Sequence, residues 1–249
     1  MDSERGGIMK NKKIIMLLPV IISGLVLVLF KPTSSYFIQK ETAENVIALG
    51  KISVKLEEEF TPPENVLPGR EFIKAPYLVN HGTKDEFVFL GVTIPKENIT
   101  LLKEQGGILK NKGSYELFRM IAESSGTELS NPFGTADFDT AFSYHKGTPE
   151  EGWIFIEASS QDTADTYIFG YNKKISPDES TIKLFDKVKL KNFINGEAVG
   201  EKNIDIQPYA IQADSLNATE LSEHYLDNVT ENDLKIIFSV IERKAVTTP

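Results

Sequence analysis

Residues Glu86–Ile94 have the sequence EFVFLGVTI, and this stretch decides the fold class. Apart from Glu86, Gly91 and Thr93, every residue in it carries a large apolar side chain. Aromatic and β-branched residues favour strands, and a short apolar run of this kind is typical of a buried strand. The stretch therefore predicts an interior strand of a β-sandwich.

Further strands are predicted on both sides of this stretch. In Ile52–Leu56 apolar and polar residues alternate, which is typical of a strand with one solvated face. Leu67–Arg70 predicts a turn, because Pro68 sets φ and Gly69 allows a positive φ. The other runs rich in aromatic or β-branched residues are Phe72–Val79, Trp153–Glu157, Thr166–Tyr171, Ile182–Leu190 and Ile204–Ala213. Many short strands with little helix between them indicate an all-β fold, a two-sheet antiparallel sandwich.

Only a few short helices are expected to decorate this sandwich. Ser114–Glu123 and Ala218–Leu226 have the spacing of short amphipathic helices. Thr230–Asp233 resembles a capping box, and the following Leu234–Arg243 fits a helix or a strand equally well. No repeat or low-complexity linker divides the chain, so one domain is expected over 37–249. Within it we expect an N-terminal strand segment at 37–56 and an insertion at about 105–151.

The N-terminus has the order of a secretory signal peptide, predicted over residues 1–36. Lys10, Lys12 and Lys13 precede the apolar run Ile14–Phe30, and small residues follow. The predicted cleavage region consists of Ser34, Ser35, Tyr36 and Phe37. A single membrane anchor is the alternative, since an apolar run of this length is near the minimum that spans a bilayer. Translation could start at Met1 or at Met9, which opens a more usual signal peptide.

Composition excludes several function classes. The 36 acidic residues outnumber the 27 basic ones, giving a formal net charge of −9. Nonspecific nucleic-acid binding needs a basic surface, so no nucleic-acid partner is expected. The chain has no Cys, which excludes disulfides, thiolate metal sites and a cysteine nucleophile. Export remains compatible with this composition, because many Gram-positive exported proteins contain no disulfide.

No catalytic motif is present in the sequence. His81, His145 and His224 stand outside any zinc-protease motif, and neither a G-x-S-x-G elbow nor a phosphate-binding glycine loop occurs. The acidic runs Glu57–Glu59 and Glu150–Glu151 are interpreted as solvated edges. We therefore expect a protein that is not an enzyme, with no catalytic or metal-binding residues and no cofactor.

Short motifs in a fixed order carry a resemblance to a known family. They begin with Tyr36-Phe37, Glu41, Asn45 and Gly50 and continue with the strand Ile52–Leu56, the turn Leu67–Arg70, Lys74-Ala75-Pro76 and Val79–Thr83. Downstream matches are Phe142-Ser143-Tyr144, Gly152-Trp153, Tyr167–Tyr171, Leu184–Val188 and Tyr209–Asp214. In this order the chain resembles the TasA and camelysin (CalY) family, whose members are exported through a SipW-type signal peptidase. The resemblance covers roughly Ile14–Asp214.

This resemblance implies a jelly-roll-like sandwich that is secreted to the extracellular matrix or the cell surface. It implies a structural subunit of biofilm matrix fibres, with other copies or related matrix subunits as partners, the signal peptidase during export, and membrane contact during export only. In TasA-like fibres the N-terminal segment of one subunit adds as a strand to the next. The corresponding residues here are Phe37, Ala43, Val46, Ile47 and Leu49, in a segment without proline.

Three alternatives stay open at this point. The N-terminal segment could be an ordinary first strand that pairs within its own domain. The protein could be a monomeric surface adhesin or binding module that keeps the sandwich without forming fibres. A camelysin-like metalloprotease is the third alternative, although zinc hydrolysis needs a set of ligands and a base that the sequence does not supply.

Overall fold

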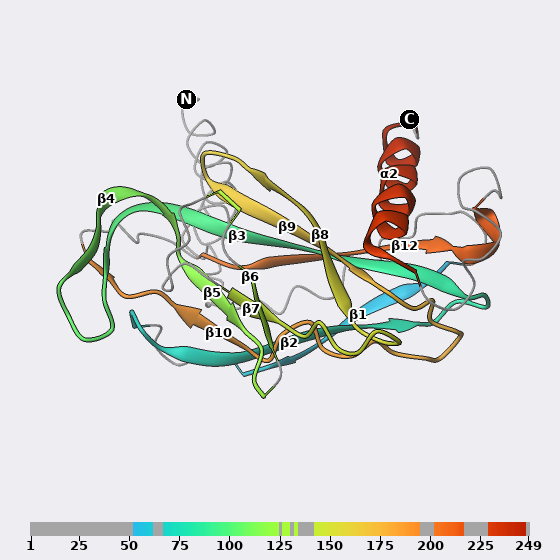
Figure 1. Ribbon diagram of the computed structural model, residues 1–249, viewed down its shortest axis with the longest axis horizontal. Helices are drawn as coiled ribbons and strands as arrows, with labels where there is room; N and C mark the ends of the chain where they lie inside the picture. Colours follow the sequence, from blue (N-terminus) through green and yellow to red (C-terminus); the bar gives the residue numbers. More distant parts are fainter. Residues whose placement is uncertain are drawn as a thin grey trace, which may run out of the picture. The chain divides into compact units, whose positions relative to one another are not determined.

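The computed structural model describes residues 52–61, 67–124, 126–129, 132–133, 142–194, 202–216 and 229–247. These residues form mainly antiparallel β-sheets (Figure 1). Within these ranges, no helix has the length and apolar character needed to cross a membrane. The predicted signal peptide and the helix expected over Ala218–Leu226 lie outside the described residues.

One sheet has four strands in the order β1-β2-β10-β5. These are β1 (Val54–Phe60), β2 (Glu71–Asn80), β10 (Lys187–Leu190) and β5 (Phe118–Ile121). All neighbours run antiparallel. The turn between β1 and β2 ends as predicted: Gly69 has a φ of 82°, and Arg70 N–H donates to the Leu67 carbonyl at 3.1 Å.

The other sheet is built around one long strand, β3 (Glu86–Leu102). The first half of β3 pairs with β12 on one side and β9 on the other, and its second half pairs with β4 and β11. β8 pairs with the far side of β9. The bounds are β4 (Ile108–Glu116), β8 (Trp153–Ser160), β9 (Ala164–Tyr171), β11 (Phe193–Ile194) and β12 (Asp205–Gln212), with a separate pair β6 (Thr127–Leu129) and β7 (Phe142–Tyr144).

The two sheets enclose the main core. Val88, Leu90, Val92 and Ile94 of β3 belong to it, together with side chains from the four-stranded sheet such as Leu78. The intervening residues Phe87 and Phe89 belong to a second apolar cluster on the opposite face of the sheet. The prediction of an all-β sandwich is confirmed, and Glu86–Ile94 lacks alternation because both of its faces are covered.

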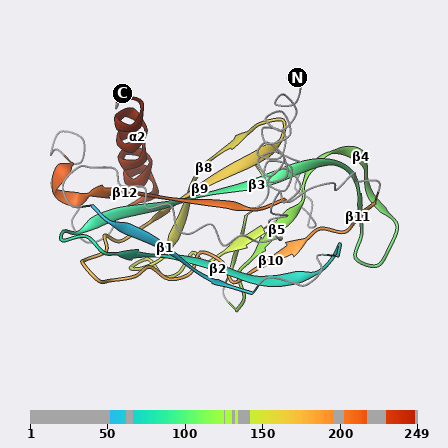
Figure 2. The same ribbon diagram turned by 180° about the vertical axis from the view of Figure 1, so that it is seen from behind.

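The second cluster is covered by the helix α2 (Glu231–Thr247). Figures 1 and 2 show α2 on the side of β3, β9 and β12 that faces away from β1 and β2. The Phe89 and Phe238 ring centroids are 5.3 Å apart.

At the start of α2, Thr230 N–H donates to Asp233 Oδ2 at 2.9 Å and Asp233 N–H donates to Thr230 Oγ1 at 3.3 Å. The capping box is therefore real, and the ambiguous stretch Leu234–Arg243 is helical. A short 3₁₀ helix, Ala213–Ser215, follows β12.

The helix predicted over Ser114–Glu123 is wrong. Residues up to Glu116 pair with β3, and Phe118–Ile121 pair with β10. Between them Leu117 N–H donates to the Pro95 carbonyl at 2.9 Å, so the chain passes here from one sheet to the other. Long-range strand pairing has overridden the local helical spacing. The region expected as an insertion at about 105–151 thus contributes β4 to one sheet and β5 to the other.

The strand predicted over Ile182–Leu190 is shorter than expected, since only β10 is regular. The preceding residues still reach β2: Thr181 N–H donates to the Leu78 carbonyl and Leu184 N–H to the Pro76 carbonyl, both at 2.9 Å. Pro76 has no N–H to donate in return, so a regular ladder cannot continue there.

Candidate functional site

The residues predicted to act in export and assembly lie outside the described residues. This applies to the cleavage region Ser34, Ser35, Tyr36 and Phe37 and to the strand-exchange residues Phe37, Ala43, Val46, Ile47 and Leu49. The first residue that the structure describes is Ile52, so it shows how the chain enters β1, the junction considered next.

Two backbone contacts fix this junction. Ser53 N–H donates to Oε1 of Glu86 at 3.2 Å, and the Ser53 carbonyl accepts from the N–H of His81 at 2.7 Å. Ile52 is buried in the main core. The last residue before β1 is therefore held by β3 and by the turn after β2.

Glu86 is an unusual residue at this junction because its side chain is buried. Burial raises the pKa of its carboxyl to about 7, and the hydrogen bond from Ser53 opposes this shift in part. The second carboxylate oxygen, Oε2, is buried without a hydrogen-bond partner. The junction thus contains a carboxyl group that changes charge near neutral pH.

β1 is the outermost strand of its sheet. It pairs with β2 on one side, and in the part of the chain that the structure describes its other side has no ladder partner. β12 is likewise paired only with β3, with Pro208 opposite Leu90, and it lies close to β1. A proline is tolerated where its missing N–H faces the free side of an edge strand. β1 and β12 are therefore two edge strands that lie close to each other.

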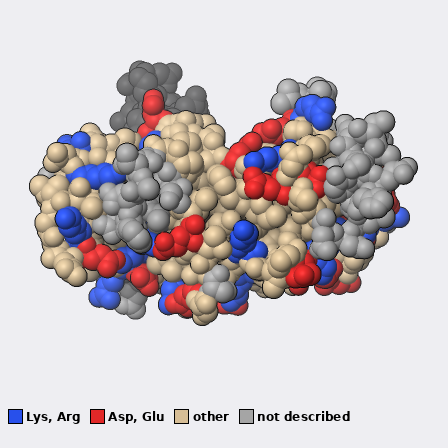
Figure 3. Space-filling view, in the orientation of Figure 1, with Lys and Arg blue, Asp and Glu red and all other residues tan. Residues whose placement is uncertain are grey.

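The acidic run on β1 is paired with lysines. Ion pairs join Lys55 to Glu57 at 2.6 Å, Lys74 to Glu58 at 2.9 Å and Lys183 to Glu59 at 2.8 Å. Charged side chains along an edge strand disfavour uncontrolled pairing with other sheets. Figure 3 shows acidic and basic side chains next to each other on the visible face. This pattern agrees with the interpretation of Glu57–Glu59 as a solvated edge.

The described histidines lie in separate places. His81 follows β2 at the junction, and His145 Nε2 lies 2.7 Å from Oδ2 of Asp186, which also accepts the N–H of Glu123 at 2.7 Å. His224 is outside the described residues. Across the described ranges, no group of three His, Cys, Asp or Glu side chains is placed to hold a metal ion.

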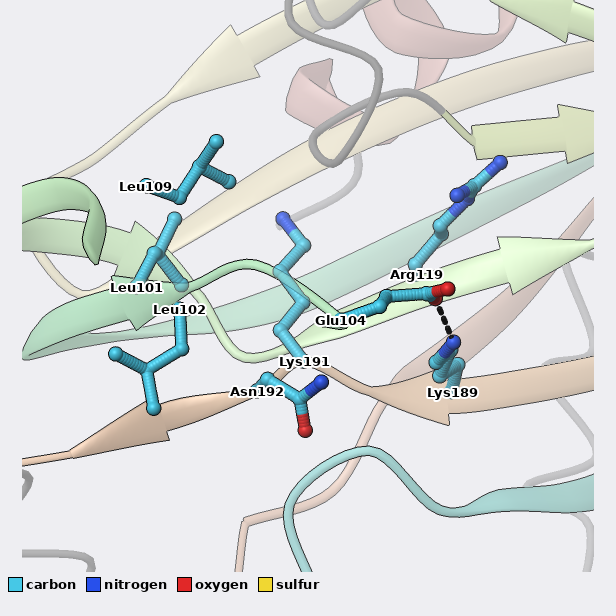
Figure 4. A pocket seen from close by; sticks show the side chains of 8 residues that line it. All are labelled: Leu101, Leu102, Glu104, Leu109, Arg119, Lys189, Lys191 and Asn192. Atoms are coloured by element: carbon cyan, nitrogen blue, oxygen red, sulfur yellow. Dashed lines mark hydrogen bonds and ion pairs between the residues drawn. The ribbon is translucent and has the colours of Figure 1, made fainter. Parts of the chain in front are cut away.

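A small hollow opens between β3, β4 and the segment around β10 (Figure 4). Its lining consists of Leu101, Leu102, Glu104, Leu109, Arg119, Lys189, Lys191 and Asn192. Its volume of about 30 Å³ has room for about two water molecules, which is too small for an organic substrate. An ion pair between Glu104 and Lys189 lies at one side, and the Lys191 side chain points away from it.

Behind this hollow lies a buried ionic cluster that sequence reasoning missed. Lys191 Nζ is 3.3 Å from Glu116 Oε2, and the Tyr167 hydroxyl donates to Glu116 Oε1. Asp165, paired with Lys96 at 3.0 Å, contributes its charge to both Glu116 and Lys191. Glu116 and Lys191 are 75 residues apart in sequence, so no local motif could have indicated the pair.

No family model, no curated protein and no solved structure matches the chain.

Proposed function

We propose that this chain is a secreted structural subunit of extracellular fibres or cell-surface assemblies, which polymerises by addition of its N-terminal segment to the sheet of another copy. The observation that carries the proposal is the position of β1. This strand directly follows the predicted strand-exchange segment, and on its outer side it has no ladder partner among the described residues.

The physics of strand addition fits this position. An added strand gains affinity from backbone hydrogen bonds and specificity from alternate side chains in pockets. The segment 37–49 has no proline, which would remove a donor, and it offers Phe37, Val46 and Leu49 as apolar anchors. One subunit supplies the segment and the next supplies an edge, so the contact is heterologous and leads to an open-ended filament.

Support also comes from the sequence motifs that resemble those of the TasA and camelysin family, and by this resemblance we infer cleavage before Tyr36 or Phe37. In the described residues, a stable sandwich with paired surface charges is suited to a structural role. The membrane would then take part during export only.

Filament formation by the processed chain tests the proposal. Protein that starts at Phe37 is expected to form filaments visible by electron microscopy, whereas protein that lacks 37–50 is expected to stay monomeric. The truncated protein keeps its acceptor edge, so small amounts added to the processed chain should cap growing ends and shorten the filaments. A synthetic peptide of residues 37–50 should compete in the same way, and a peptide with Val46 replaced by Pro should not.

Two other results would favour the alternative functions. If the processed chain stays monomeric at high concentration and at low pH, the fibre proposal is wrong and a monomeric binding module is the better interpretation. Chelator-sensitive cleavage of casein by protein purified from an independent host would instead support the metalloprotease alternative.

A further inference from the structure

Glu116 and Lys191 form a close pair inside the sandwich. Glu116 is the last residue of β4, and Lys191 follows directly after β10. Only 2% of the Glu116 side chain and 6% of the Lys191 side chain are exposed, and Nζ lies 3.3 Å from Oε2. Lys191 N–H donates to the Leu117 carbonyl at 2.8 Å, so the backbones that present the two side chains are themselves joined.

The surroundings of this pair disfavour charge. Burial is the largest cause that raises the pKa of the Glu116 carboxyl, and burial lowers the pKa of the Lys191 amine. The mutual attraction of the two groups and the Tyr167 hydrogen bond to Glu116 oppose these pKa shifts, whereas Arg119 adds to the shift of Lys191 and Asp165 to that of Glu116. Burial remains the largest cause for both groups. Both groups are therefore shifted toward a neutral carboxylic acid beside a neutral amine.

Tyr167 completes the arrangement. Its hydroxyl donates to Oε1 of Glu116, and Lys191 Nζ lies 3.3 Å from the other oxygen, Oε2. The Tyr167 ring is fully buried and packs edge-on against Phe142, with 4.7 Å between the ring centroids. Burial raises the pKa of Tyr167, so its hydroxyl stays a hydrogen-bond donor at neutral pH. Because Oε1 accepts the hydrogen bond from Tyr167, we assign it as the carbonyl oxygen of the protonated Glu116 carboxyl and Oε2 as the hydroxyl oxygen.

We propose that Lys191 and Glu116 join in an intramolecular amide (isopeptide) bond in the folded protein. The lone pair of the neutral Lys191 Nζ attacks Cδ of the protonated Glu116 carboxyl, and the bond electrons shift onto Oε1, where the Tyr167 hydroxyl stabilises the charge. A proton passes from Nζ to the departing hydroxyl, the Cδ–Oε2 bond breaks, and one water molecule leaves. Atoms and charge balance without an oxidant, a metal or a cofactor.

The closeness of the Lys191 amine and the Glu116 carboxyl is expected to make amide formation fast. Nζ lies 3.3 Å from Oε2 of the carboxyl group that it attacks, and two groups held in this way react with a high effective concentration. The neighbouring ion pair of Lys189 and Glu104 differs from the pair of Lys191 and Glu116 in its exposure. Lys189 is 19% exposed and Glu104 62%, so this pair is not enclosed as Lys191 and Glu116 are, and no amide is expected there.

The bond would link β4, which pairs with β3 in one sheet, to the end of β10 in the other sheet. The chain between the two residues would become a covalent loop, and the sheets would resist separation under load. This inference does not depend on the fibre proposal, because a monomer would contain the bond as well.

Mass spectrometry of the full chain tests the inference. Trypsin cleaves an unmodified chain after Lys191, but an amide at Nζ blocks that cleavage. The expected product is a branched peptide that joins residues 113–119 to residues 190–202, lighter by one water than the sum of its parts. If the folded protein instead yields unmodified 113–119 together with a peptide that ends at Lys191, the inference is wrong.

Two variants and a control make the test specific. K191R should abolish the branched peptide and the loss of water, whereas the control K189R should retain both. Y167F should keep the reactants and slow formation of the bond by about 100-fold, as expected for loss of one donor to a developing oxyanion. The readout is the cross-linked fraction at fixed times after synthesis, with circular dichroism to establish folding. Water loss that persists in K191R, or a rate unchanged in folded Y167F, would overturn the assignment.

Discussion

The backbone N–H of Ser53 donates to Oε1 of the buried Glu86 at 3.2 Å, and this bond connects the start of β1 to the start of β3. The other carboxylate oxygen of Glu86 has no hydrogen-bond partner. A carboxyl group in this situation makes the stability of the fold depend on pH in a definite direction.

Replacement E86Q is expected to weaken that pH dependence. The pKa of Glu86 is about 7 in the folded state against 4.5 as its ordinary value, so the folded state binds the proton more tightly. Its contribution to stability is fully present below about pH 4.5 and is lost as the pH rises through 7. Urea unfolding at pH 5 and pH 8 should show that E86Q loses about 2 kcal/mol less than the wild type over this interval.

The control for this measurement is E128Q, since Glu128 lies on the surface with 57% of its side chain exposed. This variant should retain the pH dependence of the wild type. Identical curves for E86Q and the wild type would contradict the role assigned to Glu86.

Loss of the cap in T230A should destabilise α2 by about 1 kcal/mol, because the N–H of Asp233 loses its acceptor. Chemical denaturation followed by circular dichroism measures the effect. S239A is the matched control: the Ser239 hydroxyl donates to the Ile236 carbonyl at 2.7 Å inside the helix, where alanine is tolerated better than serine. A larger loss for S239A than for T230A would argue against the capping box.

Alanine at Gly69 should cost more than alanine at Gly106. Both glycines have a positive φ, 82° and 88°, so each substitution introduces backbone strain of about 1 kcal/mol. At Gly106 a Cβ atom meets nothing within 4 Å, whereas at Gly69 it would clash with Oδ1 of Asn192. The double variant G69A/N192A should recover the difference, as measured by thermal unfolding. Equal losses for G69A and G106A would show that the turn can move away from Asn192.

The fluorescence of Trp153 should report on folding of the main core. It is the single tryptophan of the chain, it is fully buried, and its Nε1 donates to the Ile182 carbonyl at 2.9 Å. Emission at short wavelength that resists quenching by iodide is expected for the folded protein, with a shift to longer wavelength on unfolding. W153F should lower the unfolding free energy by about 2 kcal/mol, since a cavity and an unpaired carbonyl remain. Native emission typical of solvent-exposed tryptophan would contradict this position.

Local pattern was sufficient to predict most of the strands. The alternation in Ile52–Leu56 and the β-rich runs Phe72–Val79, Trp153–Glu157, Thr166–Tyr171 and Ile204–Ala213 correspond to β1, β2, β8, β9 and β12. These runs are rich in side chains that suit a sheet, and turn residues bound them, so short-range information determines their state.

One prediction was wrong and one stayed open where the deciding contacts are distant in sequence. Ser114–Glu123 has helical spacing, but Glu116 pairs with Lys96 and Phe118 with Leu190. Leu234–Arg243 suited either state until α2 was seen to pack on Phe87 and Phe89. In both cases the burial available on the sheets, rather than the local pattern, decides which structure forms.

The sequence by itself determined the all-β class and the helix cap, because these depend on side-chain periodicity and on hydrogen bonds between close neighbours. Only the tertiary structure decided that Ser53 meets Glu86 and that Lys191 meets Glu116, since the residues of these pairs are 33 and 75 positions apart in the sequence. Burial then changes the chemistry of these carboxyl groups, and burial is a property of the whole fold that no segment of the sequence contains.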